Sequence, residues 1–320
     1  MSRFPPSSHL AHALAAVALA ALTACGGAGS AGDATGETPA TPSAPAVTEK
    51  PASAGEAARF LTQASFGPVE ADIAAVQTDG YAAWIDAQLA LPASSHLANW
   101  DAAEAAAKAA GQSGTWQAGV AHSFWKTSVT GNDQLRQRVA FALSQIFVIS
   151  MSGSAVGDNP RAVAAYLDML ADKGLGNYRD LLEGVATHPL MGVYLSHLKN
   201  QKADARTGRV PDENFAREVM QLFSIGLHEL NLDGTVKTGA DGQPIESYAP
   251  ADVAGLAKVF TGWSWDCPDG PDNNCFFWGS NGGNQYTDRY QRPMQGFAQF
   301  HSTDEKKFLG VTIAAQTRAD

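Results

Sequence analysis

The chain has 320 residues, enough for one large domain or two ordinary ones, and its formal net charge is −10. This acidic balance excludes a broad basic stripe for phosphates and so argues against a nucleic-acid partner. Neither a P-loop, a GxGxxG turn after a strand nor an HExxH helix is present. Ala-rich stretches with helical periodicity recur from Glu56 to Trp263, and β-branched alternation is nearly absent. The sequence therefore predicts a mainly α, multi-helix globular domain.

The first 24 residues have the pattern of an export signal. Arg3 gives a positive start, and Leu10–Leu22 is apolar but too short to span a bilayer permanently. The end of this segment, Leu22–Cys25, is similar to the lipobox of bacterial lipoproteins, in which the Cys is lipidated. We therefore expect an exported protein anchored through Cys25 to a membrane, at the periplasmic face or in the outer membrane. The alternative is an ordinary signal peptide in which Cys25 is incidental.

Residues 25–54 differ from the rest in being rich in Gly, Ala, Ser, Thr and Pro. Such a segment buries too little apolar surface to offset its ordering entropy, and we expect a disordered tether. A flexible chain of this length spans on the order of 30 Å. The domain is expected to occupy residues 55–320.

Apolar spacing and turn residues predict the helices of this domain. The expected ranges are Glu56–Gln63, two helices within Val69–Leu91, Asn99–Ala110, Thr115–Thr130, Asn132–Met151, Arg161–Ala171, Tyr178–Val185, Leu190–Leu198, Pro211–Leu227 and Tyr248–Trp263. In Thr115–Thr130 the expected core face is Trp116, Val120, Phe124 and Trp125. Asn132–Met151 is so apolar that it predicts a central core helix. Arg136 and Arg138 oppose its dipole, so carboxylate partners are expected.

The stretch from Pro211 to Leu227 is the one around which we expect the domain to be organised. Asp212 is a suitable N-cap, and Gly226 is suited to the end of the helix. The polar face holds Glu213, Asn214, Arg217 and Glu218, with i,i+4 pairs between Glu213 and Arg217 and between Asn214 and Glu218. This face is either a solvated surface with ion pairs or a partly buried network beside a pocket.

Two loops flank this helix. Before it, Lys199, Lys202, Arg206 and Arg209 form a basic loop, which is either simply solvated or docks to an anionic polymer or partner. After it, the turn signals Asp233–Gly234 and Asp241–Gly242 predict a small hairpin excursion.

The last sixty residues are expected to be rich in loops. Cys267 and Cys275 close a short loop, and in an exported protein this predicts a disulfide. The alternative is a calcium site that uses Asp266, Asp269 and Asp272, although their spacing does not fit an EF-hand. No other cofactor is indicated. Among the aromatic residues that follow, Trp278, Tyr286 and Tyr290 either stack on sugar rings or pack on the helices.

A set of eight stretches, taken in order, resembles one large bacterial family, the domain of unknown function 1800 family. The stretches are Ala58–Gly67 (ARFLTQASFG), Leu135–Ser144 (LRQRVAFALS), Gly176–Leu182 (GNYRDLL), His188–Leu195 (HPLMGVYL), Glu213–Glu218 (ENFARE), Asp252–Val253, Thr261–Trp263 (TGW) and His301–Gly310. Each motif is weak by itself, but the ordered set, which runs from about Ala57 to the chain's last residues, is specific.

The resemblance implies an exported, mainly helical protein that is often encoded beside a sulfatase-like partner. It implies no activity, cofactor or catalytic residue. This chain departs from the family in two ways. Ala249 stands where the family has a Thr or Ser cap before Asp252, which should cost about 1 kcal/mol of capping. Family members also continue well past the motif at His301, so the resemblance implies that the domain is truncated at its C-terminus.

Three classes of function remain open. The first is a tethered binding or assembly protein of the cell envelope that holds a glycan or a partner protein. The second is an exported enzyme with an acid/base site around Glu213, Arg217, Glu218 and His301, with Asp252 and His188 as further candidates. In the third, the charged motif is purely structural and locks the helices together.

Overall fold

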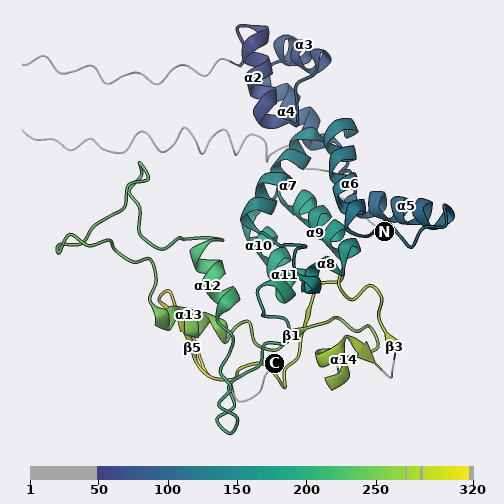
Figure 1. Ribbon diagram of the computed structural model, residues 1–320. Coiled ribbons are helices and arrows are strands. Elements are labelled where there is room, and N and C mark those ends of the chain that lie inside the picture. The colour runs from purple at the N-terminus through teal and green to yellow at the C-terminus, as the bar shows by residue number, and fades with distance from the viewer. Residues whose placement is uncertain (1–48, 271, 282–283, 317–320) are drawn as a thin grey trace, which may run out of the picture. The chain divides into compact units, whose positions relative to one another are not determined.

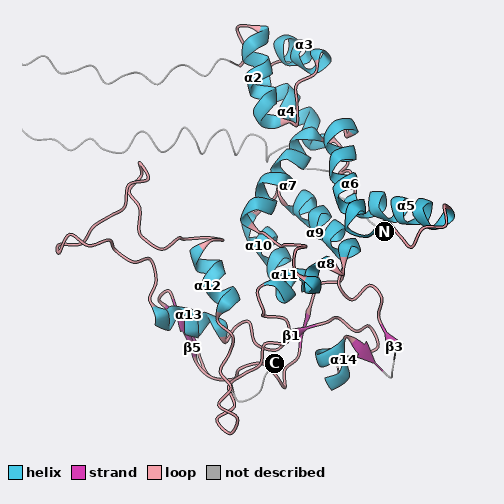
Figure 2. Ribbon diagram, viewed as in Figure 1, coloured by secondary structure: helices cyan, strands magenta, loops and turns pink. Residues whose placement is uncertain are grey.

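The computed structural model describes residues 49–270, 272–281 and 284–316. Among these residues there are thirteen helices and three small two-stranded sheets (Figure 2). This agrees with the mainly α fold expected from the sequence. The helices before residue 200 are α2 (Ala54–Ala64), α3 (Glu70–Asp79), α4 (Tyr81–Ala90), α5 (His96–Ala109), α6 (Trp116–Thr130), α7 (Gln134–Ile146), α8 (Ser154–Gly157), α9 (Pro160–Lys173), α10 (Tyr178–Thr187) and α11 (Pro189–Tyr194).

The later part of the chain has shorter elements connected by long loops. They are α12 (Asn214–Gln221), α13 (Pro250–Ala257), β1 (Trp263–Ser264), α14 (Asn273–Trp278), β2 (Ser280–Asn281), β3 (Asn284–Gln285), β4 (Gln295–Gly296), β5 (Lys306–Phe308) and β6 (Val311–Ile313). The antiparallel pairs are β1 with β4, β2 with β3, and β5 with β6.

The central helix of the described domain is α9, which packs against α5, α6, α7, α8, α10 and α11 (Figure 1). Seven of its residues are buried, among them Tyr166 and Leu170. The buried hydroxyl of Tyr166 donates to the carbonyl oxygen of Phe147 at 2.8 Å, which satisfies its polar atom inside the core.

The expectation that Asn132–Met151 forms a central core helix was wrong. The helix α7 ends at Ile146, and its only buried residues are Gln137 and Ala140. Ile146 and Val148 are exposed by 46% and 42%. The run also contains the fully buried Phe147, but most of its apolar residues are only half-buried, and α7 packs against parts of α9, α4, α2 and α6.

Arg136 and Arg138 were expected to pair with carboxylates. Among the described residues, neither makes a hydrogen bond or ion pair to a carboxylate. Arg136 donates instead to the carbonyl oxygens of Ala171, at 3.1 Å, and Leu89. Arg138 donates to the carbonyl of Gln63 and lies over the ring of Phe66. The three carbonyls belong to the last turns of α9, α4 and α2, where helix dipoles favour a cation. The two arginines therefore join four helices.

The domain packs against residues that the sequence assigned to the tether. The N–H of Tyr81 donates to the carbonyl of Glu49, Lys50 Nζ donates to the carbonyl of Thr78, and Pro51 is buried. Ser53 then caps α2 by accepting the N–H of Glu56. Packing thus begins at Glu49, since its carbonyl meets the start of α4. Residues 25–48, including Cys25, lie outside the described residues, as does the predicted signal.

The organising helix is shorter than expected. Asp212 accepts the N–H of Asn214, but the N-cap of α12 is Glu213 and makes no side-chain cap hydrogen bond, and the helix ends at Gln221. The chain then turns, and Gly226, at a φ of +76°, returns its N–H to the carbonyl of Met220. Phe215, Ala216, Met220 and Phe223 are buried, whereas Leu222 and Leu227 are exposed by 59% and 51%. The end of the predicted apolar face thus lies at the surface.

Candidate functional site

The polar face of α12 is a solvated surface. Arg217 donates to Glu213 at 3.3 Å, and the two side chains are 45% and 43% exposed. No side-chain hydrogen bond joins Asn214 to Glu218. The first of the two expected i,i+4 pairs is therefore present as an exposed ion pair, and the second is not.

His188 and Asp252 have structural roles. His188 caps α11 by accepting the N–H of Leu190 on Nδ1, and its ring packs edge-on against Tyr166. Burial lowers the pKa of His188 to about 3, so the ring is neutral. Asp252 accepts the N–H groups of Ala249 and Leu309 at 2.8 and 2.7 Å. Because Ala249 has no side-chain oxygen, only this half of a capping box is present.

His301 forms no hydrogen bond with His188 or Asp252. Its Nδ1 is 2.7 Å from the carbonyl of Thr261, and a carbonyl oxygen can only accept, so Nδ1 carries a proton. The ring lines a hollow of about 360 Å³ together with Thr261, Gly262, Trp263 and Phe297. No hydrogen bond or ion pair joins His301 or Asp252 to Glu213, Arg217 or Glu218. The acid/base constellation expected from the sequence is not assembled.

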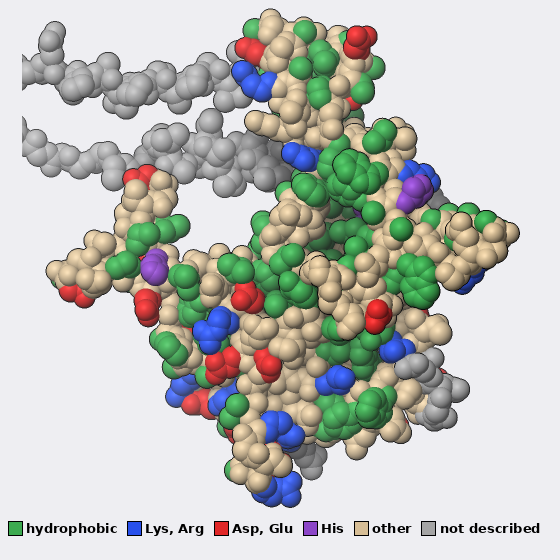
Figure 3. All heavy atoms as spheres, viewed as in Figure 1, with side chains coloured by type: hydrophobic (Ala, Val, Ile, Leu, Met, Phe, Trp, Pro, Cys, Tyr) green, Lys and Arg blue, Asp and Glu red, His purple; other side chains and the backbone are tan. Residues whose placement is uncertain are grey.

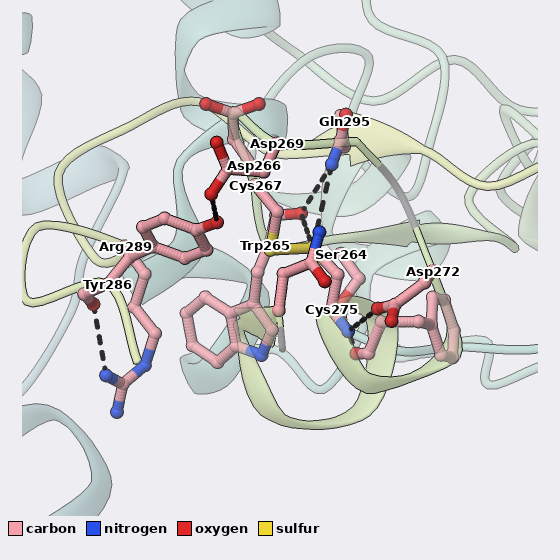
Figure 4. The surroundings of a disulfide bond; sticks show 12 residues. Ser264, Trp265, Asp266, Cys267, Asp269, Asp272, Cys275, Tyr286, Arg289 and Gln295 are labelled. Carbon is pink, nitrogen blue, oxygen red and sulfur yellow. Dashed lines mark hydrogen bonds between the residues drawn. A yellow bond between two sulfur atoms is a disulfide. The ribbon is translucent and has the colours of Figure 1, made fainter. Parts of the chain in front are cut away.

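The predicted disulfide is present. Cys267 and Cys275 are bonded, with a Cα–Cα distance of 6.1 Å, and both are buried (Figure 4). The three carboxylates around it have separate partners: Asp266 pairs with Arg292, Asp269 accepts the hydroxyl of Tyr286, and Asp272 caps α14 through the N–H of Cys275. Across the described ranges, no group of three or more His, Cys, Asp or Glu side chains is placed to hold a metal ion.

The three candidate aromatic residues lie in different environments. Trp278 is 68% exposed, and Tyr286 is held by Asp269 with the Arg292 guanidinium over its ring. Tyr290 packs edge-on against Trp265 at 4.7 Å and also lines a cleft of about 380 Å³. Of the three, Tyr290 is the one that faces this cleft, which we take as the candidate binding site.

The cleft lies where three segments that are far apart in the sequence meet. Its walls come from α5 (Trp100, Glu104, Lys108), the start of α6 (Trp116), the start of α9 (Asp158 to Ala162) and the loop from Thr287 to Gln291. Three aromatic residues, Trp100, Trp116 and Tyr290, thus contribute to a cleft whose other residues are mostly polar or charged. Trp116 is 59% exposed.

The position of Trp116 depends on tight packing beneath it. Trp100 donates its indole N–H to the Trp116 carbonyl at 3.0 Å, and a Cβ at Gly119 would lie 2.8 Å from the Trp100 ring. Trp116 itself has a φ of +50°, a left-handed conformation that is rare for a bulky residue. Such strain persists where the surroundings impose it and is frequent at binding sites.

Polar groups in the cleft are fixed by local hydrogen bonds. Arg161 forms a two-point pair with Asp101 at 2.7 and 2.8 Å, and these bonds raise the pKa of its guanidinium. The Thr115 N–H donates to Glu104, which lowers the pKa of that carboxyl. Oε1 of Gln291 is buried without a hydrogen-bond partner among the described residues. A bound hydroxyl group would satisfy this acceptor.

The prediction that Trp116 and Trp125 lie in the core was wrong for both residues. Their side chains are exposed by 59% and 65%. Trp125 lies about 140° from the buried Val120 on a helical wheel, so the helical periodicity already places Trp125 on the opposite face from Val120. Trp116 lies about 40° from Val120, and periodicity gives no sign of its exposure. It lies in the first turn of α6, before the buried stretch that begins at Gly119.

The fold and cleft together define a mainly α domain with a disulfide-bonded, loop-rich C-terminal part. Residues 59–320 match the model of a family described as protein of unknown function (DUF1800), and the chain belongs to this family. Searches of curated proteins and of solved structures gave no match. In the described part of the chain, no helix has the length and apolar character needed to cross a membrane.

Proposed function

We propose that the protein is a membrane-tethered binding protein of the cell envelope, and that it holds a glycan in the cleft between Trp116 and Tyr290. The observation that carries the proposal is the exposed indole of Trp116, fixed in a strained backbone conformation at a cleft of about 380 Å³. The tether and the lipid on Cys25 rest on the sequence pattern alone.

A glycan fits the chemistry of this cleft. The faces of sugar rings carry C–H groups that pack on aromatic rings, and their edges carry hydroxyl groups that donate and accept hydrogen bonds. Trp116 and Tyr290 supply the ring surfaces. Asp158 and Glu104 supply acceptors, Arg161 supplies donors, and Gln291 supplies an acceptor that is otherwise unpaired. A small number of placed polar groups beside apolar surface is typical of a ligand site.

Binding of defined oligosaccharides to the full-length protein tests this proposal. The probes are soluble peptidoglycan fragments and neutral oligosaccharides, titrated by calorimetry in detergent. Trp116→Ala should weaken binding about tenfold or more, because about 1.4 kcal/mol of lost contact corresponds to a factor of ten. Trp125→Ala removes an equally exposed indole of the same helix that does not line the cleft, and it should leave affinity unchanged.

Trp278→Ala is a second control, because that indole is also exposed outside the cleft. Saturable binding that is lost with Trp116 and kept with Trp125 and Trp278 supports the proposal. Loss with Trp278 alone would move the site to the C-terminal loops. Absence of binding to any of these probes by the folded wild-type protein would reject a glycan ligand.

A further inference from the structure

Residues 227–248, here called the arm, form an ordered projection with a built-in repeat. The turns at Asp233–Gly234 and Asp241–Gly242 are eight residues apart, and in each the Asp carboxylate accepts the N–H two residues on, at 3.0 Å. The backbone N–H of Glu229 donates to the carbonyl of Ile245, that of Ile245 to the carbonyl of Lys237, and that of Lys237 to the carbonyl of Glu229. These three backbone hydrogen bonds form a closed ring. These hydrogen bonds give the arm a defined structure. It projects from the rest of the described domain (Figure 1).

The arm exposes three large apolar side chains. Leu232 is fully exposed, and Leu230 and Val236 are exposed by 54% and 45%. Leu230 and Val236 lie directly opposite each other in an antiparallel bridge, so their side chains share one face. Apolar residues clustered on a projecting edge are a feature of interaction surfaces.

Charge restricts what this surface fits. The arm has four carboxylates, on Glu229, Asp233, Asp241 and Glu246, against one lysine, for a net charge of −3 with His228 neutral. One of the four, Glu229, is paired with Lys237 at 3.2 Å. Such a surface disfavours anionic lipid or polymer and favours a basic partner that also offers apolar contact.

The same chain contains a surface with the opposite character. Residues 199–210, the basic loop, hold Lys199, Lys202, Arg206 and Arg209 against Asp204, for a net charge of +3. The side chain of Arg206 is 90% exposed, and the neighbouring Val210 is exposed by 74%. Arm and loop project from different parts of the described domain, with blue side chains at the loop and green and red ones on the arm (Figures 1 and 3).

We propose that the arm of one copy docks on the basic loop of a second copy. The apolar side chains of Leu230, Leu232 and Val236 would contact Val210. The three carboxylates of the arm that form no ion pair would meet Arg206, Arg209 and the two lysines. Each copy offers both surfaces at different places, so the contact is heterologous and generates rings or chains of copies. This inference does not depend on glycan binding.

Complementation between two variants tests the contact directly. The arm variant is Leu232→Ser with Glu246→Lys, and the loop variant is Arg206→Glu with Arg209→Glu. Full-length protein is studied by sedimentation velocity in a density-matched detergent. The wild type should self-associate, each variant alone should sediment as a monomer, and an equimolar mixture should form one-to-one dimers. In that mixture, only the intact arm of the loop variant and the intact loop of the arm variant can pair.

The controls separate this contact from other causes of association. Val129→Ser with Glu70→Lys makes the same kind of change at exposed positions on α6 and α3, and it should associate as the wild type does. Each variant alone, in the same detergent, reports any sharing of micelles. Thermal unfolding checks that the variants are folded. Raising the salt concentration from about 50 to 500 mM should weaken association, since paired exposed charges are screened.

Three results would overturn the proposal. The first is a wild-type protein that stays monomeric at every concentration tested. In the second, both variants keep the association of the wild type, which would assign it to another surface. In the third, each variant is monomeric but the mixture forms no dimers, which would exclude the pairing of arm with loop.

Discussion

The indole N–H of Trp100 donates to the main-chain carbonyl of Trp116 at 3.0 Å, so one tryptophan of the cleft fixes the backbone of another. Trp100 is 8% exposed, whereas Trp116 is 59% exposed. A buried residue therefore positions an exposed one, and the two contributions can be separated by substitution.

The first prediction concerns this pair. Trp100→Phe keeps an aromatic ring in the core but removes the donor, which leaves the Trp116 carbonyl without its partner. The variant should lose about 1–2 kcal/mol of stability. It should also weaken oligosaccharide binding several-fold while Trp116 is still present. Trp100→Phe that binds as tightly as the wild type would show that the backbone of Trp116 needs no such support.

The sequence predicted the fold well where periodicity and turn residues agree. The helices α2, α3, α4, α6, α9 and α10 lie within a few residues of their expected ranges, because each is bounded by a cap or by a Gly or Pro. The composition of Asn132–Met151 gave a wrong prediction, because a long apolar run was interpreted as a central buried helix. Periodicity cannot say which helix is central, because this depends on contacts such as those of α9 with six other helices.

The candidate site was predicted less well. The disulfide followed from two cysteines and a short loop. Tyr290 was proposed as a binding aromatic, but its partners Trp116 and Arg161 come from segments more than 120 residues earlier. Their meeting depends on the packing of α5, α6 and α9, which has no signature in any single stretch. Export, the lipid anchor and a sulfatase-like partner remain predictions.

The second prediction concerns acid stability. Burial lowers the pKa of His188 to about 3 and that of His197 to about 4, from an ordinary value of 6.5. At pH values between the folded pKa of each histidine and 6.5, the unfolded chain binds a proton that the folded protein does not. The stability that is present above pH 6.5 is therefore lost as the pH falls through this window. Each histidine should contribute a slope on the order of 1.4 kcal/mol per pH unit below 6.

Urea unfolding at pH 7.5, 5.5 and 4.5 measures this slope. His188→Asn keeps an N-cap at α11 and should flatten the slope, as should His197→Gln. His122→Gln removes an exposed histidine of α6 and serves as the control, with no change expected. An unaltered slope in both buried variants would mean that other groups control acid unfolding.

The third prediction concerns Cys25. The lipobox-like Leu22–Cys25 predicts that the mature chain begins at an acylated Cys25. Mass spectrometry of the N-terminal peptide from the native membrane should find the acyl mass, and Cys25→Ser should abolish both the modification and membrane retention. A mature N-terminus at another position would replace the lipid anchor with an ordinary signal peptide.

The fourth prediction concerns Cys267 and Cys275. Their bond closes a loop of nine residues, and restricting so short a loop in the unfolded chain is worth about 2–3 kcal/mol. Replacing both cysteines with Ala should lower the free energy of unfolding by about this amount. Peptide mapping without reduction should recover the linked pair from the wild type. Rapid alkylation of either cysteine in the folded, unreduced protein would contradict the bond.

The last prediction compares two arginines of similar exposure. Arg217 is 45% exposed and makes one hydrogen bond to Glu213 at 3.3 Å, whereas Arg161 is 40% exposed and makes two to Asp101. Exposed single-point pairs contribute about 0.2–1 kcal/mol, and two-point geometry is the exception that contributes more. Arg217→Met should therefore cost less than about 1 kcal/mol in a denaturant titration, and Arg161→Met should cost more than Arg217→Met. If Arg217→Met instead cost 3 kcal/mol or more, the polar face of α12 would be a buried network in solution, because that is the scale of breaking a buried pair from one side.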